Sequence, residues 1–359
     1  MKVLLLGFSL IKYMPYASFY INALKNENAD LHLLYWNRDD TVKDTALDNV
    51  TLHEFNFTLN NQSSKFSKIS SFFKYRRFAL KLIKEIKPDR IVFLHTFPCF
   101  LLFNKLKKKY ANKFIFDYRD FTYEKFGFFK NRLNKAIQSS YATFVSSDAY
   151  RKVFSPSVLD KVYTSHNIVL DDLDDKRINE KSPSDKIRLS FWGLIRGEEL
   201  NKKIIEKIAN DNRFELHYYG REESVAINLK SFVNTINAEN IFFHGEYSPK
   251  DRAGFAVDTD IVHNIYLDTN MQMAVTNKYY DGLIYKIPQV CINGSFMGEL
   301  VKKNGVGISV DIDENFTDKI YEYLNNLDKT EFDANANKAL QAVLGEYEKG
   351  VQIIKGLIK

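Results

Sequence analysis

The chain has 359 residues, of which 45% are hydrophobic and 14% aromatic, and it carries a formal net charge of +6. This length exceeds one ordinary core and predicts two domains, and the apolar content excludes a disordered chain. Cys99 and Cys291 lie far apart without metal-ligand spacing, and the histidines form neither an HxH nor an HExxH pattern. We therefore expect a reduced, cytoplasmic protein without a metal or another cofactor.

The predicted elements begin with the apolar stretch Met1–Phe8, which is short and has no small-residue cleavage site after it. It indicates a buried parallel strand and not a signal peptide, and the lack of a run of about 18 apolar residues predicts a chain without a membrane span. Further apolar runs alternate with helix-like or turn-rich segments, which is typical of βαβ units. The predicted strands of this half are 2–6, 31–36, 90–95, 113–117 and 142–146.

The polar, charged segment 171–186 lacks periodicity and predicts a linker, after which the alternation restarts. Predicted strands are 187–192, 214–219, 241–243, 260–265 and 289–292, and predicted helices are 199–210, 223–236, 277–285, 296–303, 314–326 and 332–356. We expect an α/β fold of two Rossmann-like, doubly wound parallel-sheet domains, 1–170 and 187–340, that face each other across a cleft. A C-terminal helix within 341–359 is expected to pack back on the first domain.

Basic and aromatic residues are interleaved in the first half. Between Lys65 and Lys87 eight basic residues stand against a single acidic one, Glu85. Such clusters favour an anionic partner, here the inner leaflet of a membrane, into which Phe72, Phe73, Phe128 and Phe129 would dip. The alternative is a set of helices with solvated outer faces. Nucleic acid is not expected, because the chain shows no recognition-helix or stacking-platform pattern.

Two segments of the second half suit a phosphate group. In residues 191–197, Gly193 and Gly197 flank Arg196, so the backbone can approach a ligand while the guanidinium binds it bidentately; a solvated turn is the alternative. At the start of the predicted helix 277–285, the amides of Thr276, Asn277 and Lys278, the helix dipole and the Lys278 charge favour an anion. Asp281 could accept hydrogen bonds from a ribose diol. The alternative is a helix capped by Thr276 that carries a Lys278–Asp281 ion pair.

Taken in order, five segments resemble one known family. They are Ile115–Asp120 (a D-x-R-D strand end), Ser165–Asn167 (a hinge asparagine), Phe191–Arg196 (a strand–Gly–x–x–Arg loop), His244–Ser248 (a segment along a nucleotide base) and Thr276–Val290 (an NK-x-x-E-x-x-x-x-x-x-P helix). The set is similar to GT-B glycosyltransferases, in particular the family-4-like enzymes of bacterial capsule and lipopolysaccharide synthesis. The resemblance implies a nucleotide-sugar donor held by the second domain.

The resemblance also implies roles for single residues. Arg196 and Lys278 would neutralise the diphosphate beside Gly193, Asp281 would bind the ribose where relatives usually carry Glu, and Glu246 and Tyr247 would flank the base. The chain departs from the two-glutamate pattern at Met273, where relatives place a carboxylate that touches the transferred sugar. Asp268 or Asn270 could replace that carboxylate.

The first domain is then expected to hold the acceptor. His95 and Asp120 follow neighbouring predicted strands, so either could accept the proton of the acceptor hydroxyl. The alternatives are a packed histidine and an Asp120–Arg119 pair. Arg119, His166 and Asn167 are expected near the cleft, without a chemical step assigned to them.

These observations predict a glycosyltransferase on the cytoplasmic face of the membrane that moves a hexose from a nucleotide sugar to a saccharide acceptor, lipid-linked and destined for surface polysaccharide. The family-4 likeness implies retention of anomeric configuration; an Asp120→Asn variant should separate retention (modest loss) from inversion (near-complete loss). Two other hypotheses stay open. One is a sugar-nucleotide 2-epimerase on the same fold, and the other is a non-catalytic partner protein. The sequence names neither the sugar, the base, the acceptor nor the oligomeric state.

Overall fold

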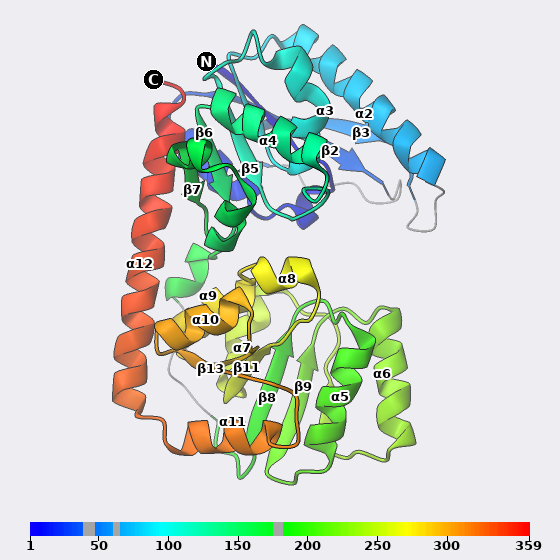
Figure 1. The fold of residues 1–359 in the computed structure, drawn as a ribbon, viewed down its shortest axis with the longest axis vertical. Helices are drawn as coiled ribbons and strands as arrows, with labels where there is room; N and C mark the ends of the chain where they lie inside the picture. Colours follow the sequence, from blue (N-terminus) through cyan, green and yellow to red (C-terminus); the bar gives the residue numbers. More distant parts are fainter. Residues whose placement is uncertain (39–46, 60–64, 175–181) are drawn as a thin grey trace. The chain divides into compact units, whose positions relative to one another are not determined.

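The computed structural model describes residues 1–38, 47–59, 65–174 and 182–359. They form two compact units, one comprising Met1–His166 with Gly345–Lys359 and the other Asn167–Leu344 (Figure 1). The expected boundaries were residues 170 and 340, and the predicted linker 171–186 falls partly on 175–181, outside the described residues. None of the helices in the described ranges combines the length and apolar character needed to cross a bilayer.

The first unit, as described, is built on a seven-stranded parallel sheet in the order β3-β2-β1-β4-β5-β6-β7. The interior strand β1 has four residues in succession that are fully buried, as expected for a strand covered on both faces. The strands are β1 (Lys2–Leu6), β2 (Asp30–Asn37), β3 (Val50–Asn56), β4 (Arg90–Phe93), β5 (Phe114–Tyr118), β6 (Ala142–Val145) and β7 (Val162–Thr164). The helices are η1 (Ile11–Tyr13), α1 (Ala17–Leu24), α2 (Lys65–Ile86), α3 (Thr96–Leu106), α4 (Gly127–Ser139), η2 (Asp148–Val153) and η3 (Pro156–Lys161).

The second unit repeats this plan with a six-stranded parallel sheet in the order β10-β9-β8-β11-β12-β13. The strands are β8 (Ile187–Trp192), β9 (Phe214–Tyr219), β10 (Ile241–Phe243), β11 (Ile261–Asn264), β12 (Gln289–Ile292) and β13 (Gly307–Val310). The helices are η4 (Leu170–Asp174), α5 (Glu198–Ala209), α6 (Ser224–Thr235), η5 (Pro249–Asp251), α7 (Arg252–Val257), α8 (Thr269–Met273), α9 (Asn277–Ile284), α10 (Phe296–Lys303), α11 (Phe316–Asn325) and α12 (Lys329–Gly356).

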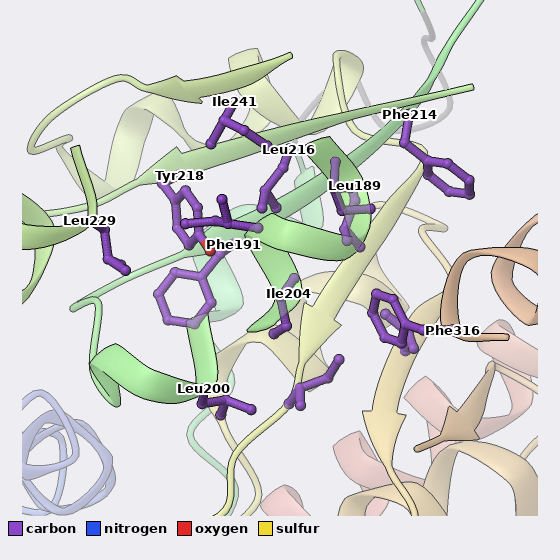
Figure 2. Close-up of a cluster of buried hydrophobic side chains, with 14 of the residues drawn as sticks. Leu189, Phe191, Leu200, Ile204, Phe214, Leu216, Tyr218, Leu229, Ile241 and Phe316 are labelled. Atoms are coloured by element: carbon purple, nitrogen blue, oxygen red, sulfur yellow. The ribbon is translucent and has the colours of Figure 1, made fainter. Parts of the chain in front are cut away.

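The core of the second unit lies between its sheet and the helices on one face. Figure 2 shows Leu189 and Phe191 of β8 and Leu216 of β9 beside Leu200 and Ile204 of α5, all among its buried side chains. These residues alternate along the strands and recur at three- or four-residue spacing on the helix, as a two-layer core requires. This packing fixes where the carboxyl ends of the strands lie.

The predicted fold class, two parallel-sheet α/β domains, is confirmed. The ten predicted strands are all present, with ends that differ by at most two residues. The strands β3, β7 and β13 and, in the second unit, the helices α7 and α8 were not predicted. Each of the three strands is the outermost strand of its sheet, where a short or half-exposed strand carries little apolar signal.

Candidate functional site

Three glycines follow three neighbouring strands at one edge of the second sheet. Gly193, Gly220 and Gly245 stand after β8, β9 and β10, and the N–H of Gly220 donates to the carbonyl of Gly245 at 2.8 Å. A Cβ on Gly220 would lie 1.8 Å from the Gly193 carbonyl oxygen, and Gly193 itself has φ of +122°. Gly220 is therefore required because the Gly193 backbone occupies the place of a side chain, whereas the space beside Gly193 itself is open, so a ligand can approach the backbone there. The sequence singled out Gly193 alone; Gly220 could have been found as another glycine directly after a strand.

The backbone of the loop that carries Arg196 is held by hydrogen bonds from α5, whereas the arginine side chain faces solvent. Asn201 on α5 donates from Nδ2 to the carbonyls of Arg196 (2.7 Å) and Gly197 (3.0 Å), and it accepts from the Tyr218 hydroxyl at 2.9 Å. The Arg196 side chain is exposed. A rigid loop with an exposed guanidinium suits a bidentate contact with phosphate. Nothing in the sequence pattern pointed to Asn201.

The start of α9 is not capped by Thr276, although Thr276 occupies the N-cap position. Its hydroxyl donates instead to Asn264 Oδ1 at 2.9 Å, and its N–H donates to the sulfur of Met297. Asn264, at the end of β11, is held in turn by Gln289 through a 2.7 Å bond. The Thr276 hydroxyl thus leaves the amides of the first turn to other partners, which makes this helix end a suitable anion site.

Lys278 is buried one residue into α9. Its Nζ donates to the Tyr266 hydroxyl and lies 4.3 Å from the centre of the Phe191 ring. Burial lowers the pKa of Lys278 to about 7; the Asp281 charge opposes this effect and the Arg196 charge adds to it. Two cations that influence each other lie at the same edge of the sheet, since β8 and β11 are neighbours. An arriving anion would hold Lys278 in its protonated form.

Asp281, one turn further along α9, belongs to a buried row of charges. Arg252 Nη1 lies 3.1 Å from Asp281 Oδ1, and Arg252 Nη2 lies 3.0 Å from Asp172 Oδ2. Burial raises the pKa of Asp281 to about 7, with Arg252 opposing that rise and Asp172 adding to it. The expected alternative, a Lys278–Asp281 ion pair, is not the contact that forms. Arg252 and Asp172 were not foreseen, because their contact with α9 joins distant parts of the chain.

The residues expected around the base lie nearby. The ring of Tyr247 packs edge-on against Phe255 at 4.9 Å, and burial together with the Asp281 charge raises the pKa of Tyr247 to about 12. Glu246 is exposed. Of the residues considered as substitutes for a carboxylate at Met273, Asp268 caps α8 by accepting the N–H of Met271 at 3.0 Å.

In the first unit the structure brings His95 and Asp120 together. His95 Nε2 lies 3.4 Å from Asp120 Oδ2, and its Nδ1 accepts the N–H of Phe97 at 3.3 Å. The second contact assigns the ring hydrogen to Nε2, which therefore donates to the carboxylate. Both side chains line a cavity of about 460 Å³ that lies within this unit. We call it the unit 1 pocket.

Arg119, His166 and Asn167 lie outside this pocket. Arg119, 6% exposed, stacks on the ring of Tyr16 and pairs through Nε with Asp117 at 2.7 Å, so it supports the strand end from within. His166 Nε2 contacts Glu346 of α12 at 2.9 Å. The boundary between the two units falls between His166 and the half-buried Asn167. In the described ranges, no three His, Cys, Asp or Glu side chains gather to hold a metal ion.

Comparison with known proteins identifies the fold. Sucrose-phosphate synthase from Thermosynechococcus elongatus matches with a TM-score of 0.75 at 11% identity, covering 100% of this chain and 99% of that one. The Anabaena HepE protein, solved in complex with UDP and glucose, matches with a TM-score of 0.68 at 12% identity over 99% and 100% of the two chains. The chain has the fold of GT-B glycosyltransferases. UDP-GlcNAc 2-epimerase from Methanocaldococcus jannaschii, with a TM-score of 0.59, 13% identity and 96% and 99% coverage, shares it.

Sequence comparison reaches less far. No family model matches the chain. A UDP-N-acetylglucosamine–N-acetylmuramyl-(pentapeptide) pyrophosphoryl-undecaprenol N-acetylglucosamine transferase from Finegoldia magna is 24% identical over 212 residues. These residues make up 55% of this chain and 55% of that protein, so the chain matches about half of the relative's length.

Proposed function

We propose that this protein is a nucleotide-sugar-dependent glycosyltransferase whose second unit binds the donor and whose first unit binds a saccharide acceptor. The observation that carries the proposal is that Arg196, Lys278 and the first amides of α9 lie at the same carboxyl edge of the second sheet as Gly193. Positive charge and amide donors held in place would neutralise a diphosphate and stabilise the charge that grows on it as the sugar leaves. That HepE was solved with UDP and glucose supports this choice of ligand.

The donor site is tested by thermal stabilisation. A ligand bound only by the native state raises the melting temperature, so UDP, GDP or dTDP should each be measured against buffer alone. The preferred nucleotide should stabilise the wild type, and the Arg196→Ala and Lys278→Ala variants should lose most of that stabilisation. Lys203→Ala, an exposed change on α5, serves as the matched control. An unchanged shift in both site variants would remove the donor assignment.

Transfer breaks the bond between the anomeric carbon and the phosphate oxygen and forms a bond from that carbon to the acceptor oxygen. The acceptor proton passes to the leaving phosphate in a retaining enzyme and to a base in an inverting one; we propose retention. The Asp120 carboxylate, to which His95 donates, is the base available in the unit 1 pocket. In Asp120→Asn, a modest loss of rate would accord with retention and a near-complete loss with inversion.

The 2-epimerase remains the second candidate, because an epimerase shares the fold. Release of nucleoside diphosphate, followed with and without acceptor, separates the hypotheses. A transferase releases it in step with glycosylated acceptor, whereas a 2-epimerase returns an altered nucleotide sugar without consuming an acceptor. A non-catalytic partner, for which Met273 is the main argument, would do neither.

We further propose that the acceptor is lipid-linked, serves surface polysaccharide synthesis and is met at a membrane. Apolar side chains lie exposed at the start of α2 and around the start of α4, among lysines and arginines: Phe66, Ile69, Phe73, Phe126 and Phe128. The relative from Finegoldia magna is named for an undecaprenol-linked acceptor, which supports the proposal. Of the four phenylalanines expected to dip into the bilayer, Phe129 is buried and Phe72 packs on Phe8 and Phe97, so these two are replaced by Phe66 and Phe126.

A further inference from the structure

A row of three charged side chains joins the first residues of the second unit to helix α9. Asp172 lies in η4, Arg252 is the first residue of α7, and Asp281 lies one turn into α9. The guanidinium stands between the two carboxylates, 3.0 Å from Asp172 and 3.1 Å from Asp281, and the side chains of Asp172, Arg252 and Asp281 are 13%, 7% and 5% exposed. Buried ion pairs are often no more stabilising than apolar residues of the same volume, so stability alone does not account for the row.

Arg252 acts on Asp281 in two ways. Its Nη1 donates to Oδ1 of Asp281, which fixes the plane of the carboxylate and the direction in which Oδ2 can accept. Burial raises the pKa of Asp281 to about 7, and the Arg252 charge opposes that rise. Without the guanidinium the carboxyl group would keep its proton at neutral pH, and a protonated acid is a poorer acceptor. Arg252 therefore keeps a buried carboxylate both charged and oriented.

Other groups that face Asp281 adjust the same carboxylate. Beyond burial and Arg252, the Asp172 charge adds to the rise in the Asp281 pKa and the Lys278 charge opposes it. The Tyr247 hydroxyl, whose pKa burial and the Asp281 charge raise to about 12, stays neutral. Arg252 and Asp172 thus act on Asp281 in opposite senses, although they contact each other.

The place of Asp281 on α9 indicates what it could bind. Lys278 and the first amides of the helix form the candidate diphosphate site, and Asp281 follows about one turn, or roughly 5 Å, further along the axis. In a nucleoside diphosphate the ribose comes next to the phosphates, and its 2′ and 3′ hydroxyls can both donate to one carboxylate. Deoxyribose lacks the 2′ hydroxyl. A carboxylate oriented to accept from the pair discriminates between the two sugars.

From this row of contacts we infer that Arg252 is a positioning residue of the donor site, which holds Asp281 ready to accept from both hydroxyls of a ribose, and that Asp172 tempers this effect. The inference rests on the proposed function, because the ligand is taken to be a nucleoside diphosphate. It narrows the donor to ribonucleotides such as UDP- or GDP-sugars and disfavours dTDP-sugars, whose nucleoside lacks the 2′ hydroxyl. It also makes the preference for ribose depend on pH, through Asp281.

The test compares a ribonucleotide with its 2′-deoxy form by isothermal titration calorimetry. At mildly alkaline pH, where Asp281 is charged, the wild type should bind UDP about tenfold or more tightly than 2′-deoxy-UDP, because the latter cannot make one hydrogen bond to a charged group. GDP and 2′-deoxy-GDP take their place if guanine is the preferred base. Arg252→Gln should weaken UDP binding to about the level of 2′-deoxy-UDP and change the latter little, whereas a merely structural loss would weaken both alike.

Two further variants bracket this result. Arg252→Lys keeps the positive charge without the planar fork, so it should retain part of the preference for UDP. Arg213→Gln is the matched control, since Arg213 also stands between two carboxylates of the second unit, those of Asp211 and Asp318, at the amino end of β9. It should leave the ratio of the two affinities unchanged.

The pH dependence of the same ratio separates the effects of Arg252 and Asp172. Both nucleotides carry the same diphosphate, so the titration of Lys278 and of the phosphates cancels. In the wild type the preference for UDP should fall as pH drops through about 7, because Asp281 then takes up a proton. Arg252→Gln should move this fall to higher pH and Asp172→Asn should move it to lower pH, since the two changes remove charges of opposite sign.

Three results would overturn the inference or the site on which it rests. Equal affinities of the wild type for UDP and 2′-deoxy-UDP, or a preference that Arg252→Gln leaves intact at every pH, would overturn the inference and leave the donor site standing. If Arg252→Gln does not fold, Asp172→Asn decides, and a fall that moves to higher pH or stays in place would contradict the inference. Failure of the wild type to bind UDP, GDP or dTDP would remove the donor assignment itself, and the inference with it.

Discussion

At the scale of single residues, Lys278 and Asp281 are two groups of the candidate site whose pKa values the fold shifts toward neutral pH. Burial brings both pKa values to about 7, from opposite directions. Lys278 donates to the Tyr266 hydroxyl, and Asp281 accepts from the Arg252 guanidinium. A site that stores a cation and a carboxylate close to their titration points can respond to the charge of an incoming ligand.

This pair predicts how stability changes with pH in the absence of ligand. The folded pKa of Asp281 lies above its unfolded value, so its contribution falls as pH rises from about 4 to about 7. The folded pKa of Lys278 lies below its unfolded value, so the unfolded chain binds more protons between about 7 and about 10, and its contribution rises there. Urea unfolding at acidic, neutral and alkaline pH should show both trends.

Two substitutions assign these trends. Lys278→Met should abolish the rise in stability between about pH 7 and about pH 10. Asp281→Asn should abolish the fall in stability between about pH 4 and about pH 7. Lys203→Met, on the surface of α5, should change neither trend. If the rise on the alkaline side persists in Lys278→Met, another group is responsible for it.

At the scale of secondary-structure elements, α2 has both a buried apolar face and exposed apolar residues. Tyr75, Ala79 and Leu82 face the core, whereas Phe66 and Phe73 are 86% and 65% exposed. Helix α3 packs against both α2 and α4, so it lies between the two helices that carry the exposed apolar residues (Figure 1). Exposed phenylalanines among lysines and arginines fit an anionic bilayer surface better than water.

A double variant tests this face. Phe66→Ser with Phe73→Ser should reduce partitioning onto anionic vesicles by at least about tenfold, since each phenylalanine removed from water contributes roughly 1.5–3 kcal/mol. Added salt should weaken the wild-type binding, because each nearby cation contributes about 1 kcal/mol. Co-sedimentation measures both. Ile227→Ser, which alters a 59% exposed residue of α6 in the second unit, is the control, and equal effects of the two changes would argue against a membrane face on α2.

The elements also show what the sequence can and cannot predict. Strands such as β1 were predicted because parallel strands covered on both faces read as unbroken apolar runs. Strand β3 was missed because it lies at the sheet edge and only Phe55 is buried in it. In the candidate site, Arg196 and Lys278 were found through motif spacing and the order of strands. Arg252 and Asp172 were not, because each acquires its place through contacts between segments far apart in the chain.

At the scale of the whole molecule, α12 is one helix of 28 residues that serves both units. Its later part contributes Ile354 to the core of the first unit and Glu346 to the contact with His166, and Leu357, directly after the helix, joins the same core. Lys355 adds an ion pair with Glu27 at 2.8 Å. The first unit is therefore completed by the last residues of the chain.

Removing one of these contacts should weaken the first unit selectively. Ile354→Ala is expected to cost about 2–5 kcal/mol, because it leaves a cavity in a packed core. Trp36 and Trp192 lie in different units, so single-tryptophan variants report on each in a urea titration. The Trp36 transition should move to lower urea and the Trp192 transition should stay. Gln352→Ala, on the exposed side of the same helix, should move neither, and equal movement of both transitions would mean that the units unfold together.

The way the chain is threaded through its two units has a practical consequence. Unit 2 is a single uninterrupted segment, whereas unit 1 is assembled from two pieces that the whole of unit 2 separates along the chain. A protein ending at Leu344 should thus hold all of unit 2, together with a unit 1 that lacks its final helix turns. A synthetic peptide of residues 345–359, added in trans, would then act as a complementing fragment, and the stability of unit 1 would rise with its concentration.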